Sequence, residues 1–308
     1  MKAFIFTAGY GERLRPVTDA MPKPLAPVLN APALAWALVL CRRAGIADII
    51  CNLHHRGDDI AGFFARNGNF GFSVAFSRED PILGTGGGLK KCEKLLEGGD
   101  FIVLNGDVVM DLDIARLIDA HRSSGAIATV VLYRHPGDPT VAQVGVRGSE
   151  VVDFKNFLGT GVESGLVYTG AAVLSPAIFR YLEDGFSSVV YTAYVEIIQR
   201  RGLSFFTHGG YWHDIGSPAS LHDVNMRMLE REAEVRTLME VLPGVEVAAV
   251  SGGAAIAREA LVERSVVGDG CAVGSGAVVR NSVLLPGARV AEGRVIENAL
   301  VLGDGVIN

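Results

Sequence analysis

Residues 7–24 read TAGYGERLRPVTDAMPKP, a glycine-rich turn followed by a lysine that stands between two prolines. The turn comes directly after residues 3–7, a short apolar run of the kind that forms a buried parallel strand. Doubly wound α/β sheets bind ligands outside the carboxyl ends of their strands. This stretch therefore predicts a parallel α/β sheet with a ligand site where its first strand ends.

The residue types in this turn point to a phosphate ligand. Ala8, Gly9 and Gly11 form the binding loop, because glycines let backbone N–H groups approach a phosphate without a Cβ atom in the way. Arg13 offers a fork of donors to phosphate oxygens, and Lys23, stiffened by its flanking prolines, adds a point charge. We expect a bound nucleoside triphosphate, with Arg13 and Lys23 acting in catalysis. The alternative is an ordinary glycine turn with a solvated basic loop.

Composition limits the partners of this chain. Its 308 residues suffice for two domains, and its net charge of −6 without a basic block argues against nucleic acid. The four cysteines lack Cys-x-x-Cys spacing, so they predict reduced, buried thiols rather than disulfides or a zinc site. The amino terminus leads straight into a strand, with no signal peptide and no apolar run of membrane-spanning length. We expect a cytoplasmic protein that binds neither nucleic acid nor membrane.

Residues 1–233 alternate strand-like and helix-like stretches, which predicts a mixed, mainly parallel Rossmann-like sheet with helices on both faces. After residue 133 the pattern becomes strand-rich and irregular, as an added antiparallel section would be. The predicted strands are 3–7, 48–53, 73–76, 101–105 and 126–133; the predicted helices are 32–43, 58–65, 87–96, 114–123, 176–182, 191–200 and 218–234.

A different periodicity follows residue 244, with aliphatic residues six positions apart in three runs separated by two steps of five. The runs are Val250, Ile256, Val262; Val267, Val273, Val279, Leu285; and Val290, Ile296, Leu302. This period is typical of a hexapeptide parallel β-helix, in which one aliphatic residue per face points into a triangular core. We predict a linker over 234–244 and a left-handed β-helix over 245–308, with about three and a half coils of roughly eighteen residues. An antiparallel sandwich or a Gly/Ala-rich loop is the alternative.

The opening motif extends well beyond a glycine pair. Its Gly-x-Gly-x-Arg-Leu-x-Pro-x-Thr pattern and the following Pro-Lys-Pro are matched by Gly9, Gly11, Arg13, Leu14, Pro16, Thr18, Pro22, Lys23 and Pro24. The chain thus resembles the sugar-1-phosphate nucleotidylyltransferases. With its carboxyl-terminal hexapeptide pattern it is most similar to the mannose-1-phosphate guanylyltransferases among them.

Two aspartates carry the predicted metal site. Asp107 follows Asn105-Gly106, directly after the end of the apolar strand 101–105. A carboxylate beside a triphosphate serves chiefly as a magnesium ligand. Its alternative role is to cap a turn. The resemblance implies that Asp107 holds a catalytic Mg²⁺, and that Asp214, within the segment YWHDIGS at 211–217, is the second ligand. His213 is expected to be structural.

Three further segments match the family less strictly. Residues 80–88, DPILGTGGG, resemble the loop that contacts the nucleobase, which implies nucleotide binding by Thr85, Gly86 and Gly87. Gly170 matches a glycine beside the sugar. Many members carry Glu-Lys-Pro after a phenylalanine where this chain has Lys155-Asn156-Phe157, so Lys155 is a candidate for the sugar phosphate in a shifted register, with a surface lysine as the alternative.

The resemblance implies transfer of a nucleoside monophosphate from an NTP to a sugar 1-phosphate. We favour GTP and mannose 1-phosphate. The alternatives are UTP or dTTP with N-acetylmuramate, glucose or heptose phosphate, and, from another class, a non-catalytic subunit that senses NDP-sugar. Since all seven histidines lie at or before His222, we expect the β-helix to be a scaffold for a homo-oligomer or for regulation rather than an acyltransferase.

Overall fold

The computed structural model describes residues 1–135 and 144–307, which form two compact units. Unit 1 comprises Met1–Gly9 and Leu40–Trp212, and unit 2 comprises Tyr10–Val39 and His213–Asn308. The predicted domain boundaries at 233 and 245 remain a prediction.

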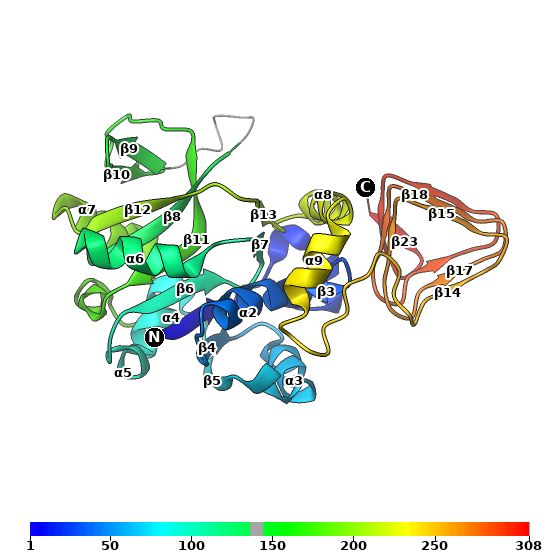
Figure 1. Cartoon of the computed structure of the whole chain (residues 1–308), viewed down its shortest axis with the longest axis horizontal. Coiled ribbons are helices and arrows are strands. Elements are labelled where there is room, and N and C mark those ends of the chain that lie inside the picture. The colour runs from blue at the N-terminus through cyan, green and yellow to red at the C-terminus, as the bar shows by residue number, and fades with distance from the viewer. Residues whose placement is uncertain (136–143, 308) are drawn as a thin grey trace. The chain divides into compact units, whose positions relative to one another are not determined.

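Unit 1 is built on a nine-stranded mixed sheet with the order β10-β9-β11-β6-β1-β4-β5, to which β8 and β12 are joined through β11 (Figure 1). Strands β1, β4, β5 and β6 run parallel, whereas β11 runs antiparallel to both β6 and β8. The strands are β1 (Lys2–Phe6), β4 (Asp48–Leu53), β5 (Ser73–Arg78), β6 (Phe101–Asn105), β8 (Ala128–Arg134), β9 (Val144–Arg147), β10 (Glu150–Phe154), β11 (Leu166–Leu174) and β12 (Leu203–His208). The mainly parallel sheet and its antiparallel section are as the sequence predicts.

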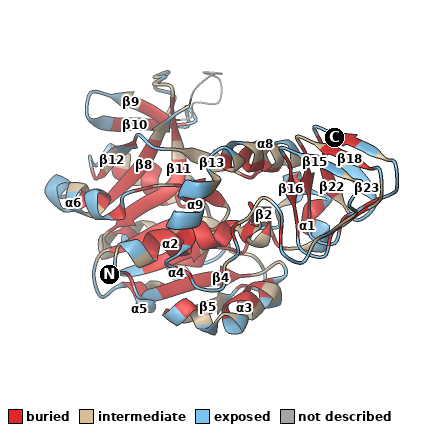
Figure 2. Cartoon of the chain, turned by 45° about the vertical axis from the view of Figure 1, so that its right-hand side comes forward, coloured by how far each residue is buried: buried red, intermediate tan, exposed pale blue. Residues whose placement is uncertain are grey.

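Burial explains why these runs form central strands. Phe4 in β1 and Val103 in β6 have no exposed surface, and β1, β4 and β6 are buried along most of their length (Figure 2), whereas the edge strand β5 is half-buried or exposed. Strands covered on both faces gain free energy from each apolar side chain, which favours near-continuous runs of β-branched and aromatic residues.

The helices of this part of the chain mostly follow the predicted ranges. They are α3 (Gly57–Arg66), α4 (Gly84–Lys91), α5 (Glu93–Leu96), α6 (Ile114–Ser124) and α7 (Val195–Gln199), together with α2 (Ala33–Arg43), which begins in unit 2 and ends in unit 1. The predicted single helix 87–96 is wrong, since Cys92 leaves the helical region and separates α4 from α5. The predicted helix 176–182 is a 3₁₀ helix over Pro176–Tyr181, and 191–200 begins as a π-helical turn over Val190–Tyr194 before α7.

The carboxyl-terminal part of unit 2 is a parallel β-helix, and Figure 1 shows its coils closing a triangle. Its three faces are the stacks β14-β17-β20, β15-β18-β21 and β16-β19-β22, and β23 folds back antiparallel on β22. The strands are β14 (Ala255–Ile256), β15 (Leu261–Glu263), β16 (Val266–Val267), β17 (Ala272–Val273), β18 (Val278–Arg280), β19 (Val283–Leu284), β20 (Arg289–Val290), β21 (Val295–Glu297), β22 (Leu300–Leu302) and β23 (Gly305–Ile307). The predicted β-helix is confirmed.

The coil length and two inward positions differ from the prediction. Ser265 and Ser282 are hydrogen-bonded equivalents in successive coils, 17 residues apart rather than about eighteen. Val267 pairs with Leu284 and Leu284 with Val301, so these residues, not Leu285 and Leu302, belong to the core series. Parallel pairing requires the same length in each coil, so the five-residue step must recur on one face in every coil.

The remainder of unit 2 consists of short elements around the amino-terminal loop and the helices that precede the β-helix. Its elements are the 3₁₀ helices Glu12–Leu14 and Lys23–Leu25, α1 (Val17–Ala20), β2 (Pro27–Val28), β3 (Ala31–Pro32), α8 (Pro218–Leu229) and α9 (Glu232–Met239). The predicted helix 218–234 is therefore two helices, and α9 extends into the segment 234–244. Buried Asn225 on α8 accepts a hydrogen bond from the N–H of Leu29 and donates to the carbonyl of Pro27. Across residues 1–135 and 144–307, none of the helices combines the length and apolar character that a membrane crossing needs.

Candidate active site

The carboxyl ends of β1 and β6 bring together the start of the glycine loop and Asp107. Phe6 pairs with Asn105 in the parallel ladder, and the N–H of Gly106 donates to the carbonyl of Phe6 at 3.0 Å. A Cβ atom on Gly106 would lie 3.0 Å from that same oxygen, so the close approach favours glycine. The predicted residues Ala8, Gly9 and Asp107 thus leave adjacent strands at one edge of the sheet.

A buried polar network supports this edge, and the sequence analysis missed it. The side-chain oxygen of Asn52 accepts from the N–H of Thr7 at 2.8 Å, and its amide donates to the carboxylate of Glu79 at 2.8 Å. The other carboxylate oxygen of Glu79 accepts from the N–H of Leu83 at 2.8 Å. Glu79, which is 3% exposed, therefore ties the end of β1 to the start of α4. It follows β5 outside every motif, so no sequence signal identified it.

The second glycine-rich loop, at the start of α4, packs closely against residues 185–189. The N–H of Gly86 donates to the carbonyl of Ser187 at 2.8 Å, and a Cβ atom on Gly87 would lie 1.8 Å from the carbonyl oxygen of Gly185. Thr85 Oγ1 accepts from the N–H of Val189 at 3.0 Å. These glycines therefore have a packing role, and their predicted contact with a nucleobase remains a prediction.

A cavity of about 290 Å³ lies between these elements of unit 1. Its lining consists of Phe6, Thr85, Asn105, Phe154, Lys155, Tyr168, Gly170, Ser188, Val189, Val190 and Tyr191. Both residues predicted to bind the sugar phosphate, Lys155 and Gly170, are in this wall. The polar groups among these residues are one cation, one amide and the hydroxyl groups of Thr85, Tyr168, Ser188 and Tyr191. A few polar groups among apolar neighbours are the usual composition of a small-molecule site.

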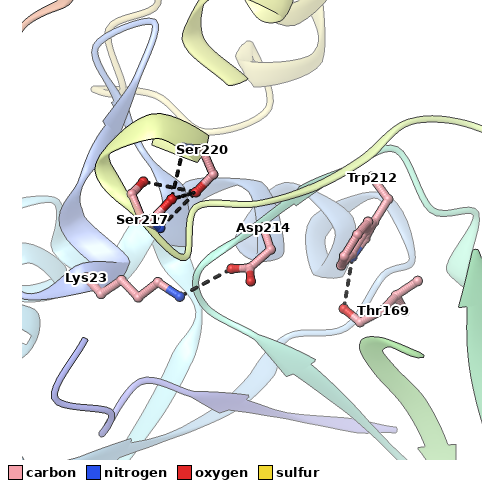
Figure 3. Close-up of polar contacts among 6 residues, drawn as sticks. All are labelled: Lys23, Thr169, Trp212, Asp214, Ser217 and Ser220. Carbon is pink, nitrogen blue, oxygen red and sulfur yellow. Dashed lines mark hydrogen bonds and ion pairs between the residues drawn. The ribbon is translucent and has the colours of Figure 1, made fainter. Parts of the chain in front are cut away.

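The geometry around Gly170 explains why a glycine stands there. Its φ angle of 84° lies in the left-handed region, and a Cβ atom would lie 2.3 Å from the amide nitrogen of Asn105. The indole nitrogen of Trp212 donates to the carbonyl of Thr169 at 3.1 Å (Figure 3). Trp212 therefore orients the backbone just before Gly170, in addition to packing against Tyr133.

Unit 2 holds the other predicted residues. The Lys23 ammonium lies 3.2 Å from a carboxylate oxygen of Asp214 (Figure 3), and their side chains are 12% and 37% exposed. A Cβ atom on Gly216 would lie 2.9 Å from the Asp214 carboxylate and 3.2 Å from the Arg13 guanidinium. The structure thus gathers Arg13, Lys23 and Asp214 around the segment that precedes α8.

Local sequence fixes both ends of this group. At Gly11, whose φ is 66°, the carbonyl accepts from Thr18 Oγ1 at 3.0 Å, which folds the glycine loop onto its own motif. Ser217 and Ser220 form a capping box, each side chain accepting from the other's backbone N–H, at 3.2 Å and 2.8 Å (Figure 3). Helix α8 therefore begins directly after Asp214–Gly216.

A partly buried ion pair, also missed from the sequence, holds the turn that leads to Trp212. His208 Nε2 lies 3.1 Å from Asp111, whose same oxygen accepts from the N–H of Tyr211 at 2.8 Å. Burial alone would lower the pKa of His208, but its bonds to Asp111 and to the carbonyl of Tyr211 raise it above the usual value. Burial would raise the pKa of Asp111, yet the hydrogen bonds from His208 and Tyr211 lower it.

The metal prediction rests on two carboxylates, Asp107 in unit 1 and Asp214 in unit 2. Carboxylate oxygens are the ligands that Mg²⁺ prefers in proteins, so the donor set fits this ion. The ammonium of Lys23 beside Asp214 shows that this carboxylate attracts a cation. Within the part of the chain that the structure describes, three or more histidine, cysteine, aspartate or glutamate side chains are nowhere grouped as a metal cage.

Comparisons with known proteins match two families along the chain. Residues 2–155 match the family described as "Nucleotidyl transferase", and residues 240–308 match "GlmU-like, C-terminal hexapeptide". A UTP–glucose-1-phosphate uridylyltransferase of Synechocystis is 31% identical over 80% of this chain and 67% of its own length. Mannose-1-phosphate guanyltransferases of Debaryomyces hansenii and Candida albicans are each 30% identical over 71% of this chain. The chain spans 62% of the length of these two relatives.

The fold also has a solved counterpart. A structure titled as a putative glucose-1-phosphate thymidylyltransferase from Bacillus anthracis, in complex with a sucrose, aligns with a TM-score of 0.65. It is 24% identical and covers 73% of this chain and 94% of its own, which shows the fold alone. The chain belongs to the nucleotidyl transferase family. Within it, the chain is a sugar-1-phosphate nucleotidylyltransferase with a carboxyl-terminal hexapeptide β-helix.

Proposed function

We propose that this protein transfers a nucleoside monophosphate from GTP to mannose 1-phosphate, giving the NDP-sugar and pyrophosphate. One observation supports the reaction class: because Phe6 pairs with Asn105, the start of the glycine loop at Ala8 and Gly9 and the segment with Asp107 leave adjacent strands at the carboxyl edge of the sheet. Such an edge is where α/β folds bind nucleotides.

In this proposal the protein acts by positioning and by charge. The N–H groups near Gly9 and Gly11 approach the triphosphate, while Arg13 and Lys23 neutralise charge that develops on the α-phosphoryl group and the departing pyrophosphate. Lys155 binds the phosphate of the sugar 1-phosphate, whose oxygen is already ionised at neutral pH. The reaction therefore needs no general base from the chain, and its rate depends on bringing two anions into line.

Nucleotidyl transferases of this family generally use a divalent metal. We propose Mg²⁺, held by Asp107 and Asp214 together with substrate phosphates, because Mg²⁺ is commonly bound by one or two carboxylates and phosphate oxygens. Bound there, it would neutralise phosphate charge and polarise the phosphoryl oxygen.

The choice of GTP and mannose 1-phosphate rests on the relatives, several of which carry that activity in their names. The uridylyltransferase and the thymidylyltransferase names keep UTP or dTTP with glucose 1-phosphate as the alternative. The four cysteines are free and buried, as expected of reduced thiols, and we place the reaction in the cytoplasm, where nucleoside triphosphates are made. A homo-oligomer is also proposed, and light scattering of the purified chain would test it.

The deciding experiment is a matrix of four nucleoside triphosphates against mannose, glucose and N-acetylmuramate 1-phosphates, read by pyrophosphate release. We expect the highest kcat/KM for GTP with mannose 1-phosphate. Faster turnover of another pair would replace the substrate proposal and keep the reaction class. Nucleotide binding without pyrophosphate release from any pair would favour a non-catalytic NDP-sugar sensor instead.

A further inference from the structure

Exposed aromatic side chains border the cavity of unit 1, and the proposed chemistry does not use them. Tyr191 lines the cavity and is 40% exposed, and Phe157 is 57% exposed with its ring centre 5.3 Å from that of Tyr191. Leaving two large rings in contact with water forgoes the free energy of burying them. Such a surface beside a cavity is typical of a ligand contact.

Hydrogen bonds to one buried carboxylate hold the loop that carries Phe157. Asp153, which is 1% exposed, accepts hydrogen bonds from the N–H of Leu158 at 3.0 Å and from the N–H and hydroxyl of Thr160 at 3.0 and 2.8 Å. Burial would raise the pKa of this carboxyl, but these bonds lower it, so the ionised form is stabilised. A buried carboxylate thus fixes residues 154–160.

This loop presents two kinds of group to one place. Lys155, in the left-handed region with φ 51°, lines the cavity as a cation, and Phe157, two residues on, packs against Tyr191 with the ring planes tilted by 38°. Phe154 between Asp153 and Lys155 is buried and anchors the loop against Tyr168 and Tyr194. The result is a positive group for an anion with aromatic surface next to it.

A sugar 1-phosphate has the matching chemistry. Its phosphate is an anion, and one face of a pyranose ring carries C–H groups with partial positive charge, which an electron-rich aromatic face attracts. The cavity of about 290 Å³ lies at the lower end of small-molecule sites, so it suits one sugar rather than a whole nucleoside triphosphate.

We propose that Phe157 and Tyr191 are specificity-determining residues that form an aromatic wall for the pyranose ring of the sugar 1-phosphate, and that Asp153 is the positioning residue of this wall. The inference rests on the proposed function for the identity of the acceptor substrate. It goes further by assigning recognition of the ring to Phe157, which stands in the segment where the family's Glu-Lys-Pro is absent, and to Tyr191.

Equilibrium binding tests the wall without turnover, with mannose 1-phosphate, glucose 1-phosphate and inorganic phosphate as probes. We take whichever of the two sugar phosphates the parent protein binds more tightly. We expect Tyr191→Ala and Phe157→Ala to bind that sugar phosphate about tenfold more weakly, while their affinity for inorganic phosphate is unchanged. Tyr191→Phe keeps the ring and should bind as the parent does. Phe186→Ala is the matched control, because Phe186 is 77% exposed and is not part of the cavity wall.

Asp153→Asn tests the positioning role. It should raise KM for the sugar phosphate several-fold and leave KM for the triphosphate unchanged, a split that general loss of structure would not produce. The proposal is overturned if Tyr191→Ala binds sugar phosphate normally, if inorganic phosphate loses affinity equally, if the triphosphate site is affected instead, or if the parent binds neither sugar phosphate. Ring-dependent binding without pyrophosphate release would refute the proposed function alone.

Discussion

Substituting Gly170 by alanine probes the cavity at the point where backbone conformation and packing coincide. Alanine at φ 84° must adopt a left-handed conformation, which costs about 1–2 kcal/mol. Its Cβ atom would also lie 2.3 Å from the Asn105 amide, and overpacking of this kind costs about 1–3 kcal/mol more. We expect Gly170→Ala to lower the free energy of unfolding by about 2–5 kcal/mol.

Gly148→Ala is the matched control, because it separates the two contributions. Gly148 has φ 62°, yet a Cβ atom there would meet nothing within 4 Å. It should lose only the conformational term of about 1–2 kcal/mol and keep normal kinetics. Gly170→Ala should in addition displace Asn105, a cavity residue, and raise KM for the sugar phosphate about tenfold or more.

Urea unfolding and steady-state kinetics of both variants supply the comparison. If the two variants lose equal stability and both keep the parental KM for sugar phosphate, the contact between Gly170 and Asn105 has no bearing on the cavity, and the reasoning fails.

Other predictions concern the metal ligand, the partly buried ion pair of His208 with Asp111, and the β-helix core. Asp107→Ala should lower kcat by about 10² or more with the fold intact, whereas exposed Asp119→Ala should not; near-normal pyrophosphate release from Asp107→Ala would remove the metal assignment. Because the folded pKa of His208 is raised, its stabilising effect is complete below its unfolded pKa of about 6.5 and is lost as pH rises through the folded value. The difference in Tm between the parent and His208→Gln should therefore shrink from pH 6 to pH 8.5, and a constant difference would contradict the ion pair with Asp111. Leu284→Ala removes an inward side chain and should cost about 2–5 kcal/mol in urea unfolding, whereas Val295→Ala, at a position 59% exposed, should cost little; equal losses would argue against the observed register.

Sequence periodicity sufficed to predict the architecture, because the strands of the sheet and the coils of the β-helix each have a pattern of apolar residues that is visible over a short stretch of sequence. The strands around Phe4 and Val103 are buried on both faces. Such strands are continuous apolar runs, which can be recognised from a few consecutive residues of the sequence. The β-helix likewise follows from its six-residue step. Its register did not, since Leu284 and Leu285 are both buried aliphatic residues, and only pairing with Val267 in the preceding coil distinguishes them.

Helix boundaries failed where tertiary contact overrides local propensity. Residues 84–88 are rich in glycine, which disfavours a helix, and the prediction accordingly began at 87. The structure begins α4 at Gly84, because a helix without side chains at this point can pack directly on the backbone of Gly185 and Ser187. The gain from close packing exceeds the entropic cost of fixing glycine.

The supporting residues of the site were invisible for a related reason. The groups predicted to contact phosphates, Arg13 and Lys23, stand at fixed spacing along one short segment, so a motif can describe them. Asp111 acts through the N–H of Tyr211, 100 residues away, and Glu79 acts through Asn52 and Leu83 on separate elements. Any acid in a compatible place can fill such a role, which leaves no fixed spacing to recognise. Residues that orient a site are therefore found from the hydrogen bonds of the folded chain.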